Sequence, residues 1–400
     1  MNTSTTLGQA DLGTPSKPST NAVHVSIPEA GMDSAQQRLH SKNDTGGSPR
    51  FGPDDGFWQD LRGKVDAYFR DSGRSERDAP AMYAKSALVL SVWGSLYAIL
   101  VFASTSWWQA VPLAALLGLA SAAIGFNIAH DGGHKAYSRH RWINRAAAAT
   151  LDLVGGSSVQ WRWKHSVLHH QFVNLAGYDT DIDVGVLGRL SPFQKHRSFH
   201  RWQHLYMWPL YGFLALKWHL VDDFKDAVTG LLGKSSAPRL KPKDLVGMLF
   251  GKLVFFGLVF ALPSLFHPFW MVAVFYVGAN FVQGLALSLV FQLAHAVESS
   301  AFPPVPRDRR MDASWAVHQI RTTSDFCRGN RLLTWLLGGL NFQIEHHLFP
   351  QIGHVHYPAL SRLVERACLQ RGIEYHEHRT FLAGVKAHFR WLKRMAFAAS

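Results

Sequence analysis

Two long charge-free runs dominate the pattern of hydrophobic and polar positions. No Asp, Glu, Lys or Arg occurs in residues 86–130 or 253–297. Each run is too long for one membrane crossing of roughly 20 residues and suits two crossings with a tight turn. Turn signals lie between the expected crossings, at residues 106–109 with two tryptophans and at 263–268 with two prolines. The pattern predicts four transmembrane helices in two hairpins, over about 86–106, 109–129, 247–266 and 269–295.

The rest of the chain carries weaker signals. Residues 1–55 are rich in Ser, Thr, Gly, Pro and Asn without a hydrophobic period, which predicts a disordered tail before a membrane-embedded domain over 56–400. The apolar positions from Phe57 to Phe69 have helical spacing and predict an amphipathic helix, either at the membrane surface or packed in a soluble core. The moderately apolar segments 146–160 and 204–216 are too short to cross, so we expect interfacial or re-entrant helices.

Composition supports an all-α integral membrane protein. Charged residues make up 17% of the chain, against roughly 25% in soluble domains. The net charge of +13 could suit nucleic acid, but the basic residues alternate with the predicted spans and form no nucleic-acid motif. We therefore expect no nucleic-acid partner and attribute these residues to anionic headgroups and the positive-inside rule. The absence of an apolar secretory signal favours a bacterial inner membrane.

An even number of crossings puts the N-terminal, middle and C-terminal regions on one side of the membrane. All three regions are basic, which predicts that this side is cytoplasmic. Three histidine clusters fall in these regions and would form a histidine-rich cytoplasmic cap. Trp161–Lys164 would lie at the headgroup level, where Arg162 or Lys164 could anchor the protein or hold a substrate phosphate.

The three histidine clusters are candidates for metal binding. In the first two, His130 and His134, and His165 and His169, are four residues apart and share a helix face. The glycines between His130 and His134 allow another element to approach closely. Neutral imidazole is a common transition-metal ligand, and adjacent histidines can point to different ions, so the doublets suggest two metals. The doublets are His169–His170 and His346–His347, the second with Gln343 one turn earlier.

One more histidine and several carboxylates accompany the clusters. His295 ends the fourth predicted span at the depth where His130 ends the second, and an ionisable residue there is a functional candidate. A thiolate-free histidine site with open positions suits iron, copper, zinc or nickel. Cys327 and Cys368 form no metal pattern and are expected to be packing residues. Carboxylates near the clusters could orient the imidazoles: Asp131, Asp179, Asp181, Asp183 and Glu345.

The chain resembles the membrane-bound fatty acid desaturase family. The resemblance covers roughly residues 57–385 and is carried by the motifs HDGGH at 130–134, HSVLHH at 165–170 and QIEHH at 343–347, set around two hairpins. Gln343, where many desaturases have histidine, resembles the front-end branch, which works between an existing double bond and the carboxyl end. The second motif has three residues between its first two histidines where many relatives have two.

The resemblance implies an enzyme that inserts a cis double bond into an acyl-CoA or acyl-lipid, with O2 as co-substrate. It implies a di-iron centre held by eight histidines, with Gln343 at or beside it: His130, His134, His165, His169, His170, His295, His346 and His347. Many front-end enzymes carry a fused cytochrome with a His-Pro-Gly-Gly motif, which this sequence lacks. Electrons are therefore expected from a separate ferredoxin or b-type cytochrome with its reductase. A hydroxylase of the same architecture and a membrane metal transporter are the alternatives.

Overall fold

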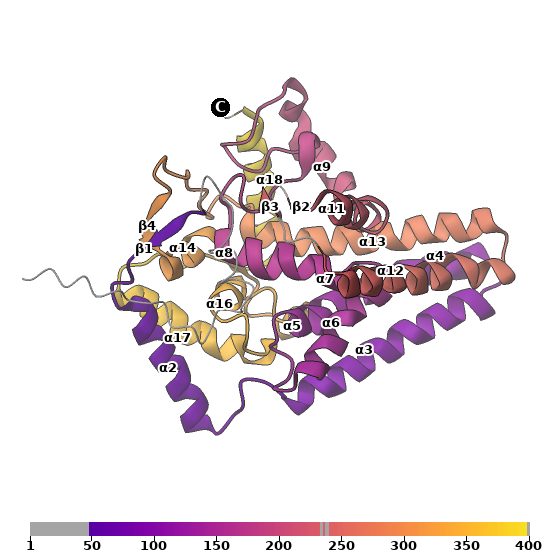
Figure 1. Ribbon diagram of the computed structural model, residues 1–400, viewed down its shortest axis with the longest axis horizontal. Coiled ribbons are helices and arrows are strands. Elements are labelled where there is room, and N and C mark those ends of the chain that lie inside the picture. Colours follow the sequence, from indigo (N-terminus) through magenta and orange to yellow (C-terminus); the bar gives the residue numbers. More distant parts are fainter. Residues whose placement is uncertain (1–47, 233–234, 237–239, 398–400) are drawn as a thin grey trace, which may run out of the picture. The chain divides into compact units, whose positions relative to one another are not determined.

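Helices make up most of the structure, a computed structural model that describes residues 48–232, 235–236 and 240–397. The prediction of a mostly helical membrane protein is confirmed, with four helical segments long and apolar enough to cross a bilayer. Figure 1 shows these four segments side by side on the right and the remaining elements gathered at their left-hand ends. The four candidate spans are Pro80–Ala103, Trp107–Gly133, Pro242–Leu265 and Phe269–His295.

Three of the spans combine α-helix with other helical turns. The first is α3 (Pro80–Ala98) and the π-helix η1 (Ile99–Ala103), and the second is α4 (Trp107–Ile124), the π-helix η2 (Gly125–Ala129) and α5 (His130–Gly133). The third is α12 (Pro242–Phe256), the π-helix η7 (Gly257–Ala261) and the 3-10 turn η8 (Pro263–Leu265). The fourth is the single helix α13 (Phe269–His295).

The first and third spans begin earlier than the charge-free runs predict. Pro80 and Pro242 stand in the first turns of these helices, where proline starts a helix without losing a hydrogen bond. The added turns of the first span carry Lys85, whose Nζ is buried 3.1 Å from Nε2 of His354. Lys252, within the predicted third span but before the charge-free run, has its Nζ buried 2.7 Å from Oδ2 of Asp223. The charge-free runs therefore underestimate the lengths of the first and third spans.

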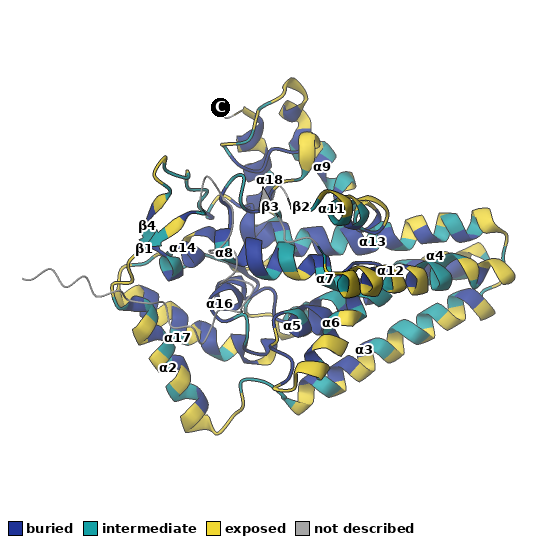
Figure 2. Cartoon of the chain, viewed as in Figure 1, coloured by how far each residue is buried: buried dark blue, intermediate teal, exposed yellow. Residues whose placement is uncertain are grey.

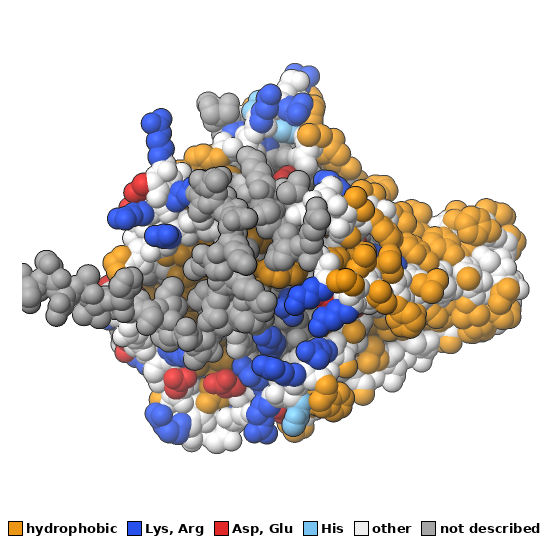
Figure 3. Space-filling view, in the orientation of Figure 1, with side chains coloured by type: hydrophobic (Ala, Val, Ile, Leu, Met, Phe, Trp, Pro, Cys, Tyr) orange, Lys and Arg blue, Asp and Glu red, His pale blue; other side chains and the backbone are white. Residues whose placement is uncertain are grey.

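The inner spans are α4 and α13. Only 17% of the apolar windows of the first and third spans is buried within the protein, against 50% and 44% for the second and fourth. Gly118 allows the inner pair to meet closely, because a Cβ there would lie 2.2 Å from the Ala279 carbonyl oxygen. Figure 2 shows the outer spans largely exposed, and Figure 3 shows hydrophobic side chains covering the outside of the spans.

The other elements form a cap at one end of the spans. Its helical elements are α2 (Phe57–Ser72), α6 (Arg141–Leu153), α7 (Ser158–Trp161), the π-helix η3 (Arg162–His169), α8 (His170–Phe172), η4 (Gly185–Leu187), η5 (Ser198–Trp202), α9 (Gln203–Tyr211), α10 (Leu214–Lys217), the π-helix η6 (Trp218–Asp222), α11 (Asp223–Thr229), α14 (Trp315–Thr322), α15 (Arg331–Leu336), α16 (Gln343–Leu348), η9 (His354–His356), α17 (Tyr357–Gln370) and α18 (Phe381–Phe397).

Three small two-stranded sheets complete the described chain. β1 (Arg50–Gly52) pairs in parallel with β4 (Arg310–Ser314), and β5 (Asp325–Phe326) pairs in parallel with β6 (Glu377–His378). β2 (Leu231–Leu232) and β3 (Ser235–Ser236) form an antiparallel pair. The tail expected over 1–55 lies mostly outside the described residues, but β1 falls within it, so ordered structure begins before residue 56.

The expected amphipathic helix is α2, and its apolar face packs inside the cap. Phe57, Leu61, Val65 and Phe69 are buried in one cluster with residues of α17. Of the two interpretations of this segment, the structure therefore favours a packing helix over one lying on a membrane. The segments 146–160 and 204–216 contribute to α6 and α7 and to α9 and α10.

Candidate metal centre

Five elements bring the predicted histidines together at the cap end of the spans. α5 and the loop after it carry His130 and His134, η3 and α8 carry the second cluster, α13 ends at His295, and α16 carries the third cluster. All eight imidazoles are buried. The clusters are far apart in sequence, so the site exists only in the folded chain.

Two π-helical segments shape these elements. η2 immediately precedes His130, and η3 covers most of the second cluster, where the His170 amide donates to the His165 carbonyl as a π-helix requires. π-Helical turns often occur at functional sites. Helical spacing correctly predicted that His130 and His134 share a face, and their ring centroids lie 4.7 Å apart. It did not predict that the neighbouring turns are π-helical.

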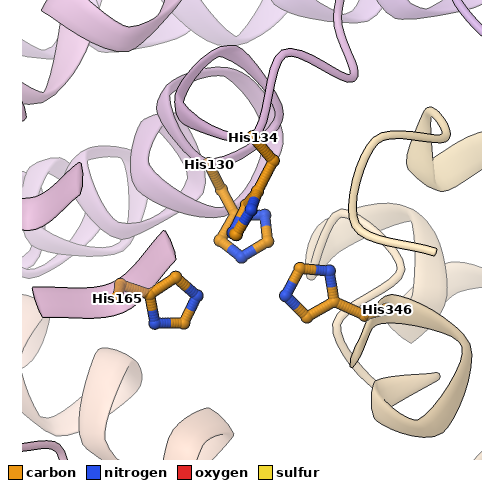
Figure 4. A group of neighbouring side chains, drawn as sticks. All are labelled: His130, His134, His165 and His346. Atoms are coloured by element: carbon orange, nitrogen blue, oxygen red, sulfur yellow. The ribbon is translucent and has the colours of Figure 1, made fainter. Parts of the chain in front are cut away.

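The first group of ligand candidates comes from all three clusters. One nitrogen each of His130, His134, His165 and His346 lies within 4.8 Å of every other. The rings of His130 and His346 are only 4.4 Å apart between centroids. Figure 4 shows the four imidazoles pointing toward a common space. Together they can therefore surround one metal ion.

The second group combines His169, His295 and His347, again with nitrogens within 4.8 Å of one another. His170 lies between the groups: its ring centroid is 4.5 Å from that of His346 and 4.2 Å from that of His347. The doublet of α16 thus divides between two groups. In the second cluster, His165 belongs to the first group and His169 to the second. Their rings are nevertheless stacked 5.0 Å apart and share Asp181 as a neighbour, as their expected position on one helix face predicts.

The histidines are held by their outer nitrogens. Nδ1 of His169 lies 3.1 Å from Asp179, and Nδ1 of His165 lies 3.2 Å from Asp181. Nδ1 of His347 is 3.1 Å from the Gln319 side-chain oxygen, and Nδ1 of His346 is 3.2 Å from the Tyr357 hydroxyl. Such partners fix the orientation and tautomer of a ligating imidazole.

The inner nitrogens have no hydrogen-bond partner within the described chain. This holds for Nε2 of His134, His165, His169, His346 and His347, and for both ring nitrogens of His170 and His295. Buried polar atoms are normally hydrogen-bonded, so this many orphaned nitrogens facing one another require a ligand. A transition metal accepts lone pairs from neutral imidazoles, and the donor set therefore fits two ions.

The electrostatics keep most of these imidazoles neutral. Burial, reinforced by neighbouring imidazoles, lowers the pKa of His134, His170, His346 and His347 well below its ordinary value. Metal ligands must be deprotonated, so these shifts prepare the site for binding. His169 is the exception: burial opposes its cation, but Asp179 and Asp181 outweigh burial and raise its pKa.

The other expected residues occupy varied positions. Asp131 contacts His354 and lies 3.7 Å from Nδ1 of His130. Oε1 of Glu345 lies 3.0 Å from the hydroxyl oxygen of Tyr375 instead of meeting an imidazole. Gln343 is buried on α16, and its side-chain amide donates a hydrogen bond to the Leu340 carbonyl at 2.9 Å. Asp183 accepts a hydrogen bond from the Gly185 amide at 3.2 Å.

Three supporting residues were absent from the sequence interpretation: Gln319, His354 and Tyr357. Each is buried and contacts a ligand candidate or its neighbour. His354 and Tyr357 follow the third cluster closely, but their spacing carries no metal signature. Their role is visible only once the chain is folded.

The structure also places Lys164 and the two cysteines. Lys164 forms an ion pair with Asp226, so its ammonium group is neutralised within the protein. Cys327 and Cys368 are both buried free cysteines, as expected for packing residues.

Comparison with known proteins gives a consistent result. A family model described as fatty acid desaturase matches residues 106–379. The sn-1 linoleoyl-lipid 6-desaturases of Synechocystis sp. and Arthrospira platensis are 36% and 35% identical, over 86% of this chain and 96% and 94% of theirs. The acyl-lipid (8-3)-desaturase of Physcomitrium patens is 36% identical over 85% of this chain and 71% of its own.

Proposed function

Because the chain belongs to the fatty acid desaturase family, we propose that it is a front-end acyl-lipid desaturase with a di-iron centre. The substrate would be an acyl chain that already contains a double bond, and the new cis bond would form on its carboxyl side. The observation that carries the metal assignment is the double group of buried imidazoles whose inner nitrogens lack partners.

The reaction balances with an external electron source. A –CH2–CH2– unit, O2, two electrons and two protons give –CH=CH– and two waters. Iron, when bound, supplies the strongly oxidising O2 chemistry that no side chain can provide for an unactivated methylene. The electrons would come from a separate ferredoxin or b-type cytochrome with its reductase.

The chain's own residues would position metal and substrate. The eight histidines would hold two irons, with Asp179, Asp181, Gln319 and Tyr357 fixing four of the rings. A mainly apolar cavity of about 110 Å³ lies between the four spans. Tyr276 and Gln283 of α13 line it, and further along this helix the Phe291 ring lies 5.5 Å from that of His165. We infer that the methyl-terminal part of the acyl chain occupies this cavity.

The cap would face the cytoplasm. The basic residues that support this orientation lie in the N-terminal, middle and C-terminal regions, which the four spans leave on one side. A cytoplasmic cap is also where soluble electron carriers could reach the centre.

The test is expression in a host fed linoleate, with a compatible electron donor co-expressed. We expect a new polyunsaturated fatty acid with its added double bond on the carboxyl side, and none from His346→Ala. His140→Ala is the matched control, because His140 is exposed and lies outside the metal groups. A hydroxylated product would assign the hydroxylase alternative. An active His346→Ala enzyme would remove this residue from the ligand set.

Iron content separates failure of the centre from failure of the partner. The purified parent should contain about two irons per chain, and His346→Ala fewer. A parent that binds no iron would overturn the di-iron proposal even if no electron donor had been found.

A further inference from the structure

A group of large apolar side chains is exposed on the cap beside α9. Its members come from η4, η5 and the start of α9, and between 39% and 60% of each is exposed: Val186, Leu187, Phe199, Trp202 and Leu205. We call this group the shelf. Contiguous apolar exposure of this kind marks an interaction surface.

The shelf is built by hydrogen bonds between its segments. The Tyr206 hydroxyl donates to the Leu187 carbonyl at 2.6 Å, and Nε2 of His200 lies 2.9 Å from the Val186 carbonyl oxygen. These bonds join η4 to η5 and α9, although the segments are separated in sequence. The apolar side chains are therefore presented together by a defined fold.

The C-terminal end of α9 rests on the inner span α13. The Ser288 hydroxyl donates to the Tyr211 carbonyl at 3.2 Å, and the ring of Phe213 packs edge-on against Phe281 at 5.5 Å. Close approach is possible because Gly284 has no side chain: a Cβ there would lie 2.5 Å from the Gly212 carbonyl oxygen. α9 and the turn after it are thus at the depth of these α13 residues.

That depth is within reach of lipid. A hydrocarbon core of about 30 Å spans roughly 20 helical residues, counted along α13 from Phe269 to near residue 289. Ser288 then lies at the cap-side boundary, and Phe281 lies about 10 Å inside it. The exposed Phe213 is consequently at hydrocarbon depth, and Leu205 of the shelf lies on α9, the helix that precedes it along the chain.

Surface chemistry continues the same trend. Figure 3 shows hydrophobic side chains running from the spans to the protrusion that carries α9, where basic side chains lie next to them. Arg197 and Arg201 are exposed next to the shelf, and the Arg201 guanidinium lies 5.6 Å from the Trp202 ring. Within the part of the chain that the structure describes, neither forms an ion pair with a carboxylate. Basic and aromatic side chains side by side are typical of a headgroup-level surface.

We propose that the shelf is immersed in the leaflet on the cap side of the bilayer and that Arg197 and Arg201 bind the phosphates of anionic phospholipids. Anionic lipid is the favoured occupant because apolar contact with the spans is continuous and the rim is cationic. Each exposed Lys or Arg near such a surface attracts anionic lipid measurably. The proposal stands independently of the desaturase chemistry.

The first test places a spin label at Leu187→Cys in the full chain, reconstituted in nanodiscs. Collision with O2 and with a water-soluble nickel complex reports immersion. Leu253→Cys, exposed on the outer span α12, is the immersed reference, and Leu369→Cys, exposed on α17, is the aqueous reference. The native cysteines are buried and give a low labelling background, which is measured on the parent.

We expect the Leu187 label to match Leu253, with nickel accessibility several-fold below that at Leu369. A label as accessible to nickel as Leu369 would overturn the proposal and leave a water-facing surface for a protein partner. Protection that disappears when each nanodisc holds one copy would also overturn it, because the surface would then be a contact between two chains.

The second test concerns the cations. Adding phosphatidylglycerol to phosphatidylcholine nanodiscs should lower the nickel accessibility of the Leu187 label when the rest of the chain is unaltered. The same addition should leave that accessibility unchanged in the Arg197→Gln/Arg201→Gln variant. Arg70→Gln/Arg74→Gln, which removes the same charge from the α2 region, should respond like the parent. Equal responses in all three proteins would contradict the phosphate assignment.

Discussion

Nδ1 of His354 lies 2.8 Å from Oδ2 of Asp131, and Nε2 of the same ring lies 3.1 Å from Nζ of Lys85. This buried imidazole joins the carboxylate beside His130 to the loop that follows the third histidine cluster. Two segments more than two hundred residues apart are thereby held at the metal centre. Replacing His354 therefore tests how residues around the histidines contribute to metal binding.

His354→Ala should weaken iron binding without removing a ligand. Loss of a group that holds a ligating imidazole directly typically costs 10- to 100-fold in metal affinity or activity. His354 acts on His130 only through Asp131, so we expect a loss of about 10-fold or less. Iron content after titration with a competing chelator measures it. His356→Ala is the control, since His356 is buried nearby against Phe69 at 5.0 Å and outside the ion-pair chain. Equal iron retention in both variants would contradict the assignment.

The glycines of the first cluster provide a second test. A Cβ at Gly132 would lie 2.4 Å from the Ala148 amide nitrogen of α6, so Gly132→Ala must displace α5 or α6. We expect a loss of about 1–3 kcal/mol in stability and lower iron content, because α5 carries His130. Gly63→Ala on α2, where no atom lies within 4 Å of the added Cβ, should leave iron content unchanged and raise stability by about 0.5–1 kcal/mol, because alanine favours a helix interior over glycine. Thermal unfolding and iron analysis of the two variants decide.

The buried histidines predict acid sensitivity of the metal-free protein. Burial lowers the pKa of His165 to about 3 and that of His170 well below its ordinary value, so the unfolded chain binds more protons in acid. Their contribution to stability is complete above pH 6.5 and falls as pH decreases, by about 1.4 kcal/mol per pH unit for each histidine. Unfolding temperatures at pH 7.5 and 5.5 should therefore differ less for His170→Gln than for the parent. An identical pH dependence would contradict the neutral assignment.

A buried carboxylic acid, Asp325, predicts a pH dependence of stability opposite to that of the histidines. Burial raises the pKa of Asp325 to about 6, despite hydrogen bonds from Tyr375 and the Ile344 amide. The folded chain therefore holds a proton that the unfolded chain releases near pH 4, and this contribution is lost as pH rises through 6. Asp325→Asn should gain about 1 kcal/mol or more over the parent between pH 5 and pH 7.5. Denaturant midpoints of the metal-free proteins at the two pH values measure the gain.

Local chemistry made much of this protein visible in its sequence. The charge-free runs determined four spans because a bilayer excludes charge over a fixed length, and the spans begin early only where Pro80 and Pro242 start helices whose lysines are buried against partners. The histidine clusters were visible because neutral imidazole is a common metal ligand and three motifs in one chain bring together seven of its 22 histidines. The motifs also carried the family resemblance.

Tertiary structure decided the relationships between distant residues. It placed His170 between two groups of imidazoles. It also supplied Gln319, His354 and Tyr357 as partners of the clusters. It also turned α2 inward and left the side chains beside α9 outward. A helical period states that one face is apolar but not what covers it. Contacts such as that of Gly284 with Gly212 depend on chain segments that only folding brings together.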